Sequence, residues 1–126
     1  MLTVLLVEDH PMNRKLFRDI LEIQFAVIEA ESAESALEIL KTHRPDLLLL
    51  DMQLPGMDGL SLARLLKHDP QWAAIPIIGL SAHAMTRDVE QALDAGCADY
   101  ITKPITEDPF AFLERISKVI PSVSAV

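Results

Sequence analysis

Carboxylates follow two of the apolar runs in this sequence. Asp51 comes directly after the run Leu47–Leu50, and the acidic pair Glu8-Asp9 comes directly after Val4–Val7. If the two runs form neighbouring parallel strands, their carboxyl ends meet at one edge of a sheet, where ligands bind in open α/β folds. Three carboxylates this close repel one another strongly unless a cation lies among them. Such oxygen ligands suit Mg²⁺, with Mn²⁺ as the alternative metal.

Two further polar side chains are expected at the same edge. Ser81 follows the apolar run Ile77–Leu80, and Lys103 follows Tyr100–Thr102. Because parallel strands all point the same way, both residues would join the carboxylates around one crevice. The Lys103 ammonium offers a positive charge to a phosphate oxygen, and the Ser81 hydroxyl can donate a hydrogen bond to another.

The chemistry that this cluster suggests is phosphoryl transfer. A carboxylate can attack phosphorus and form an acyl phosphate, and Asp51 is the candidate for that role. A metal ion held by Glu8, Asp9 and Asp51 would neutralise the charge that develops. The backbone carbonyl of Gln53 could supply a further oxygen ligand. The cluster therefore predicts a divalent-metal site beside a carboxylate that accepts a phosphoryl group.

The segments that must position these residues alternate between short apolar runs and longer amphipathic stretches. Continuous apolar runs are typical of parallel strands covered on both faces. The predicted strands are Thr3–Val7, Ala26–Glu29, Leu47–Leu50, Ile77–Leu80 and Tyr100–Thr102. The predicted helices are Pro11–Glu22, a helix that starts at Ser32 and ends before Pro45, Leu60–Lys67, a helix from Thr86 or Arg87 to Gly96, and a helix from Thr106 or Asp108 to about Ile120.

This alternation predicts one α/β domain with a five-stranded parallel sheet in a doubly wound (βα)5 arrangement. We expect the single domain to span residues 1–126, with a core of about residues 3–120 and a tail at 121–126. In the first helix, the apolar spacing predicts that Leu16, Ile20 and Ile23, or their neighbours, face the core. The basic side chains of that helix are expected to form a solvated face; they are Arg14, Lys15 and Arg18.

Composition and charge exclude several classes of protein. The chain has 126 residues, half of them hydrophobic, which is enough for one core. Its net charge of −8 argues against direct binding to nucleic acid, which needs a basic surface. The single cysteine, Cys97, excludes an intramolecular disulfide. No apolar run reaches the roughly 18 residues that a membrane span needs, and a signal-peptide pattern is absent, so a cytoplasmic protein without membrane insertion is expected.

The residues resemble a known family, the receiver domains of two-component response regulators, from about Val4 to Ile120. The motifs that carry the resemblance are Glu8-Asp9, Asp51 followed by Pro55-Gly56-Met57-Asp58-Gly59, Ser81-Ala82, Tyr100 and Lys103-Pro104. Within the family the chain looks most like single-domain regulators of the DivK type, and like receivers attached to hybrid kinases. The segments that carry this narrower likeness are Met12–Phe17, Ala82–Met85 and Cys97–Pro104. The resemblance implies the flavodoxin-like receiver fold.

The resemblance also implies a mechanism. A histidine kinase, or a histidine phosphotransfer protein, would give its phosphoryl group to Asp51. The phosphoryl group would draw in Ser81, and the side chain of Tyr100 would turn inward. The face formed by the fourth helix, the fifth strand and the fifth helix would then change and control the binding of a downstream protein. The chain would catalyse its own phosphoryl transfer and hydrolysis without being a turnover enzyme.

Three finer expectations follow from the same resemblance. Gln53 and His83 stand two residues beyond the acceptor and the hydroxyl residue, and their side chains would modulate how water reaches the acyl phosphate. His10 follows the acidic pair where many receivers carry Asp or Asn. The peptide bond between Lys103 and Pro104 is expected to be cis, which is plausible only before proline.

Other interpretations compete with this one. One alternative is a docking module that does not use phosphorylation; a missing acceptor, acidic pair or lysine would favour it, and none is missing. An aspartyl phosphatase would need a second acid two residues past its nucleophile, where Gln53 stands. A flavin-binding protein would want a Ser/Thr/Gly-rich loop after the first strand, where this chain has Glu8-Asp9-His10-Pro11. A receiver fragment of a hybrid kinase or of a larger regulator is a further alternative.

Overall fold

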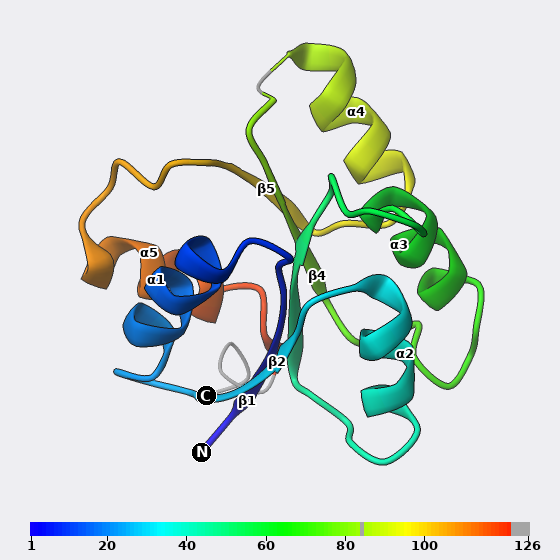
Figure 1. The fold of residues 1–126 in the computed structure, drawn as a ribbon, viewed down its shortest axis with the longest axis horizontal. Helices are drawn as coiled ribbons and strands as arrows, with labels where there is room; N and C mark the ends of the chain where they lie inside the picture. The colour runs from blue at the N-terminus through cyan, green and yellow to red at the C-terminus, as the bar shows by residue number, and fades with distance from the viewer. Residues whose placement is uncertain (84, 122–126) are drawn as a thin grey trace.

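The computed structural model describes residues 1–83 and 85–121, and there it contains one parallel sheet flanked by helices (Figure 1). The spatial order of the strands is β2-β1-β3-β4-β5. The strands are β1 (Thr3–Val7), β2 (Ala26–Ala30), β3 (Leu47–Asp51), β4 (Ile77–Ser81) and β5 (Asp99–Thr102). The helices are α1 (Pro11–Leu21), α2 (Ala33–Leu40), α3 (Gly59–Lys67), α4 (Thr86–Asp94) and α5 (Pro109–Ser117). The predicted doubly wound, five-stranded parallel sheet is confirmed.

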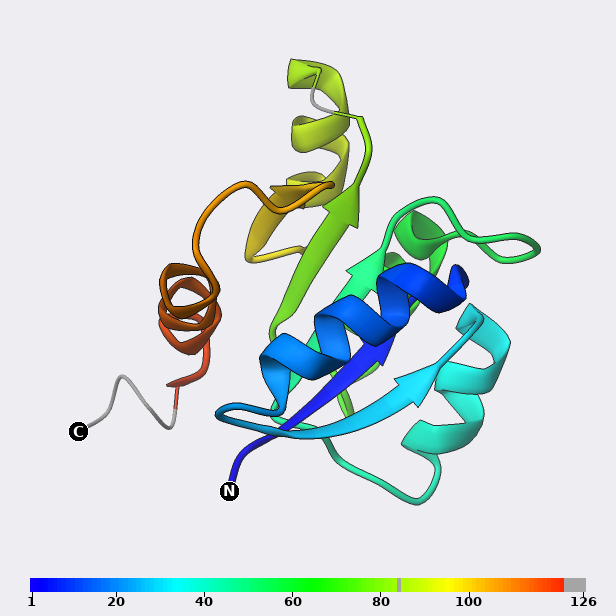
Figure 2. The ribbon, with the colours of Figure 1, turned by 60° about the vertical axis from the view of Figure 1, so that its left-hand side comes forward.

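Helices cover both faces of the sheet, with α1 and α5 on one side and α2, α3 and α4 on the other (Figures 1 and 2). Alternate residues of a strand therefore enter different apolar clusters: in β1, Val4 packs with α1 and α5, whereas Leu5 packs with the opposite layer. Because both faces are covered, β3 and β4 are buried along their whole length. This double coverage explains the continuous apolar runs.

Of the residues named in the prediction for α1, Ile20 is partly buried, and the fully buried positions are neighbours of the named ones, as the prediction allowed. Phe17 and Leu21 are buried, whereas Leu16 and Ile23 are 51% and 56% exposed. The Phe17 ring lies 6.1 Å from the ring of Phe112 in α5. Turning the helix by one position buries this large aromatic side chain in preference to Leu16, because burying an aromatic ring removes more apolar surface from water.

The ends of the elements lie within a few residues of the predicted ones. Ser32 begins α2 with a capping box to Ser35, and Asp108 caps α5 through the backbone N–H groups of Phe110 and Ala111. The fifth helix ends at Ser117, earlier than predicted. Of the predicted tail, 121–126, residues 122–126 lie outside the described part of the chain.

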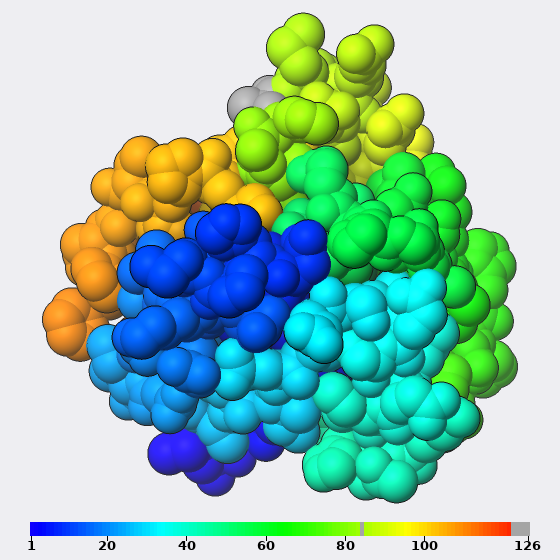
Figure 3. All heavy atoms as spheres, in the orientation of Figure 1, coloured from blue at the N-terminus to red at the C-terminus, as the bar shows by residue number. Residues whose placement is uncertain are grey.

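Helix α4 projects beyond the rest of the molecule (Figure 3). Ala92 is its buried residue, and Val89 is partly buried against the same apolar cluster. Gly96, just after this helix, has a positive φ of 106°, which suits glycine at a helix end. Within residues 1–83 and 85–121, no helix is long and apolar enough to cross a membrane.

Candidate functional site

The register of the sheet brings the predicted carboxylates together. Strands β1 and β3 are neighbours, and Val7 pairs with Leu50, so the residues that come next, Glu8 and Asp51, meet at the same edge. One ligand oxygen from each of Glu8, Asp9 and Asp51 lies within 4.8 Å of the others. Glu8 and Asp51 are buried, whereas Asp9 is exposed. The cluster therefore consists of two buried carboxylates, Glu8 and Asp51, and one candidate ligand, Asp9, that is exposed to solvent.

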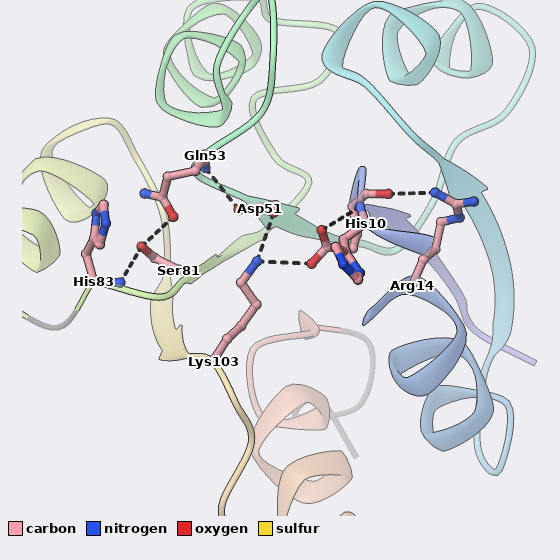
Figure 4. Close-up of polar contacts among 8 residues, drawn as sticks. His10, Arg14, Asp51, Gln53, Ser81, His83 and Lys103 are labelled. Atoms are coloured by element: carbon pink, nitrogen blue, oxygen red, sulfur yellow. Dashed lines mark hydrogen bonds and ion pairs between the residues drawn. The ribbon is translucent and has the colours of Figure 1, made fainter. Parts of the chain in front are cut away.

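Lys103 joins the two buried carboxylates (Figure 4). Its Nζ lies 2.9 Å from Oδ2 of Asp51 and 3.1 Å from Oε1 of Glu8. Its backbone N–H donates to the carbonyl oxygen of Ser81, which continues the pairing of β5 with β4. The peptide bond between Lys103 and Pro104 is cis, as predicted. Burial disfavours the ammonium charge, but the hydrogen bonds and attraction to Asp51 and Glu8 outweigh it and raise the pKa of Lys103.

The negative charge at the site exceeds what Lys103 balances. Burial, together with the neighbouring Asp51 carboxyl, raises the pKa of Glu8 to about 7. The backbone N–H of His10, 3.1 Å from Oε2 of Glu8, acts in the opposite direction, as Lys103 does. Three carboxylates of this kind fit a hard divalent cation, because oxygen ligands suit Mg²⁺ and a cation would favour their ionised forms. The carbonyl oxygen of Gln53 stands two residues beyond Asp51 as a further candidate ligand.

A second set of contacts extends from Asp51 to the loop after β4 (Figure 4). The backbone N–H of Gln53 donates to Oδ1 of Asp51 over 2.9 Å. The hydroxyl of Ser81 donates to Oε1 of Gln53 over 2.7 Å, and the backbone N–H of His83 donates to Ser81 Oγ over 3.0 Å. Gln53, which lies two residues beyond the end of β3, is thus joined through its side chain to Ser81 at the end of β4.

Tyr100 lies inward in this structure. Its side chain packs in the apolar cluster under α3 and α4, and its hydroxyl donates to the carbonyl oxygen of His83 over 2.6 Å. Burial raises the pKa of the Tyr100 hydroxyl. The inward position that the resemblance linked to activation is therefore the one seen here, and it ties β5 to the loop between β4 and α4.

Arg14 is a site neighbour that the sequence reasoning missed. It was expected on a solvated face, but its Nη1 donates to the backbone carbonyl of Glu8 over 3.0 Å (Figure 4). Its Nε also lies 3.4 Å from Oε1 of Glu29 on β2. An arginine one turn into the helix that follows an acidic pair is the local signal that could have identified this contact. Arg14 holds the backbone that carries the acidic pair.

The chain matches a family model. The model describes a response regulator receiver domain, and it matches residues 4–115. The polar-differentiation response regulator DivK of Brucella anthropi is 41% identical over 109 residues, which cover 86% of this chain and 89% of that protein. The likeness therefore extends over nearly the whole length of both proteins.

Solved structures of receiver proteins are similar to this chain in fold. A putative response regulator from Chloroflexus aurantiacus has a TM-score of 0.88 and 28% identity, over 94% of this chain and 97% of that one. The receiver domain of a sensor histidine kinase from Pseudomonas aeruginosa, solved with a magnesium ion in its active-site cleft, has a TM-score of 0.84 and 30% identity, over 95% of this chain and 98% of that one.

A doubly wound sheet with an acidic cluster and a lysine at its carboxyl edge defines a receiver. The chain belongs to the response regulator receiver domain family of two-component signalling systems. Within that family it is a DivK-like response regulator.

Proposed function

We propose that this protein accepts a phosphoryl group on Asp51 from a histidine kinase or a histidine phosphotransfer protein, in a Mg²⁺-dependent reaction. The observation that carries the proposal is the bridge from Lys103 to both buried carboxylates, Asp51 and Glu8, with Asp9 beside them. A structural ion pair at the surface would not need a lysine held between two buried acids at the carboxyl edge of the sheet.

In the proposed step a carboxylate oxygen of Asp51 attacks phosphorus, and the phosphorus–nitrogen bond to the donor histidine breaks. The histidine nitrogen leaves with the electron pair of that bond. Lys103 lies within hydrogen-bond reach of Oδ2 of Asp51, so it can attract an incoming phosphoryl oxygen. Glu8, Asp9, Asp51 and the carbonyl of Gln53 would hold Mg²⁺, or Mn²⁺, which supplies positive charge for the phosphoryl oxygens when bound.

The proposed output is a change in the face formed by α4, β5 and α5. In this proposal Ser81 turns toward the phosphoryl group, and Tyr100 couples the loop after β4 to β5 through its bond to His83. Helix α4 projects from the body and has few buried residues, which suits an element that moves (Figure 3). The side chains of Gln53 and His83 are exposed beside the acceptor and would modulate the lifetime of the acyl phosphate.

Partners and location belong to the same proposal. The partners are the phosphodonor and a downstream protein, without direct contact to nucleic acid because the net charge is −8. The protein is a phosphoacceptor that catalyses its own phosphorylation and hydrolysis and is not a turnover enzyme. Residues 1–126 form the single receiver domain of the proposal, in the cytoplasm.

Intact mass after incubation with acetyl phosphate tests the acceptor. We expect one phosphoryl adduct on the wild-type protein with Mg²⁺, no adduct with a chelator, and no adduct on Asp51→Asn. The substitution preserves size and removes the nucleophilic oxygen, so the fold should be retained. An adduct on Asp51→Asn at the wild-type level would contradict the assignment.

Beryllofluoride separates two reasons for a missing adduct. If the wild-type protein shows no adduct but forms a Mg²⁺-dependent beryllofluoride complex at Asp51, the phosphate is short-lived and the proposal stands. If neither forms, the chain is a docking module that works without phosphorylation, and the proposal is wrong.

A further inference from the structure

We propose that the side chain of Gln53 is a positioning residue that restrains the hydroxyl of Ser81 and so weakens the affinity of the site for a phosphoryl group. This inference rests on the proposed function, because it concerns the hydrogen bond to Gln53 that Ser81 must break before its hydroxyl can bind a phosphoryl oxygen. It assigns to Gln53 an action on the hydroxyl of Ser81, in addition to any effect on how water reaches the acyl phosphate.

The argument begins with the number of protons available. A serine hydroxyl has one proton to donate and two lone pairs with which to accept. Ser81 donates its proton to Oε1 of Gln53 over 2.7 Å and accepts from the backbone N–H of His83 over 3.0 Å. Ser81 cannot donate to a phosphoryl oxygen while it donates to Gln53. The two acceptors therefore compete for one proton.

The burial of Ser81 and the exposure of Gln53 affect the competition between Gln53 and a phosphoryl oxygen for the Ser81 proton. Ser81 is fully buried, so its proton needs an acceptor supplied by the protein or by the phosphoryl group. Gln53 is exposed, so its released amide oxygen can be hydrated. The contact with Gln53 therefore satisfies Ser81 without a phosphoryl group. Without that contact, two acceptors remain for the Ser81 proton: the neighbouring hydroxyl of Tyr100, which donates its own proton to His83, and a phosphoryl oxygen. The phosphoryl oxygen is charged and is therefore the stronger acceptor.

The position of Gln53 couples this restraint to the acceptor. Its backbone N–H donates to Oδ1 of Asp51, while its side chain reaches Ser81. Through His83, Ser81 is also joined to the hydroxyl of Tyr100. One residue thus spans the acceptor and the start of the chain of contacts that leads to β5 (Figure 4).

Methionine is the informative replacement for Gln53. Its side chain has the same length, and its thioether is only a weak acceptor. Loss of the restraint predicts tighter binding of a phosphoryl mimic, whereas damage to the site would predict weaker binding. The direction of the change therefore distinguishes a positioning role from a structural one.

The experiment measures the dissociation constant of beryllofluoride with saturating Mg²⁺ by titration of the full chain. We expect Gln53→Met to bind about fivefold more tightly than wild type, which corresponds to one neutral hydrogen bond. In a Ser81→Ala background the same change at Gln53 should alter affinity by less than about twofold, because no hydroxyl remains to be released. Urea unfolding of each variant shows that it is folded.

Gln71→Met is the matched control. Gln71 is exposed in the segment before β4, and its side chain has no hydrogen-bond partner within residues 1–83 and 85–121. We expect this control to bind beryllofluoride with the wild-type dissociation constant, which excludes a general effect of replacing glutamine by methionine.

The outcomes separate the two proposals. If the wild-type protein binds no beryllofluoride, this inference is wrong, and if it also forms no acetyl phosphate adduct, the proposed acceptor function is wrong as well. If the wild type binds and Gln53→Met binds equally or more weakly, the acceptor function stands and the restraint by Gln53 is wrong. Tightening of the same size with and without Ser81 would also overturn the restraint, because the effect would then not act through that hydroxyl.

Discussion

Glu8 is a buried carboxylate whose charge is only partly balanced. It shares the ammonium of Lys103 with Asp51, and Oε1 of Glu8 lies 3.1 Å from that nitrogen. Burial and the neighbouring carboxyl raise the pKa of Glu8 to about 7, above the ordinary value of 4.5. This group therefore links the protonation of the site to the stability of the fold.

The direction of that linkage gives a prediction for the metal-free protein. Because the folded chain holds the Glu8 proton to a higher pH than the unfolded chain, folding binds a proton between the two pKa values. The contribution of Glu8 to the free energy of unfolding is fully present below about pH 4.5 and is lost as the pH rises through about 7. Urea unfolding with a chelator, at several pH values across this window, measures the loss.

Glu8→Gln is the control for this prediction, since the amide keeps the shape of the side chain and does not titrate. We expect the free energy of unfolding of Glu8→Gln to fall less with pH than that of wild type over the same window. Identical pH dependence in the two proteins would show that Glu8 does not titrate as proposed.

At the scale of elements, the start of α3 fixes the backbone of the acceptor strand. Gly59 begins the helix, and its N–H donates to the carbonyl oxygen of Met52. A Cβ atom at this position would overlap the carbonyl oxygen of Asp51 and lie 2.8 Å from Cα of Met52. Asp58 caps the helix by accepting from the backbone N–H of Ser61. The turn therefore brings the helix directly against the end of β3.

We predict that Gly59→Ala destabilises the fold and disturbs the acceptor. Because the obstacle is backbone and not a flexible side chain, the free energy of unfolding should fall by about 1–3 kcal/mol. The yield of acetyl phosphate adduct on the folded fraction should also fall, because the displaced atoms belong to Asp51 and its neighbour. Urea unfolding and intact mass measure the two effects.

Gly79→Ala is the matched control in β4. A Cβ atom there would meet the flexible side chain of Met52, with a nearest distance of 3.4 Å. We expect a change of less than about 1 kcal/mol, because glycine is itself unfavourable inside a strand. Equal losses in the two variants would contradict the importance assigned to the close approach at Gly59.

At the scale of the whole molecule, the candidate metal ligands come from segments that only folding brings together. Glu8 and Asp9 follow β1, and Asp51 ends β3. We therefore predict that Mg²⁺ binds the folded chain and raises its free energy of unfolding. The gain should be about 2.7 kcal/mol at a free Mg²⁺ concentration of 100 times the dissociation constant.

Urea unfolding with Mg²⁺ or with a chelator measures this gain, and KCl at matched ionic strength is the control for screening of the net charge of −8. Asp9→Asn should reduce the gain at a given Mg²⁺ concentration, because it removes the exposed ligand. A gain of the same size in KCl would show that screening, and not a metal site, stabilises the protein.

Much of the fold and of the site could be predicted from local sequence. Short apolar runs identified the strands, most clearly β1, β3 and β4, because residues buried on both faces leave that pattern within five positions. The cap at Ser32 and the polar residues at the carboxyl ends of β1, β3, β4 and β5 are equally local. Parallel strand direction then placed Glu8, Asp51, Ser81 and Lys103 at one edge without knowledge of side-chain positions.

The remaining features depended on packing between segments far apart in the chain. Which positions of α1 are buried was decided by the fit of Phe17 against Phe112. The contacts of the Arg14 and Gln53 side chains with Glu8 and Ser81 depended likewise on distances that only the folded chain sets. The sequence by itself determined which groups meet at the edge of the sheet, because strand direction and residue type are local properties. Only the tertiary structure decided which group bonds to which, because a hydrogen bond depends on distances of a few tenths of an ångström, and those distances are set by how the two helical layers pack on the sheet.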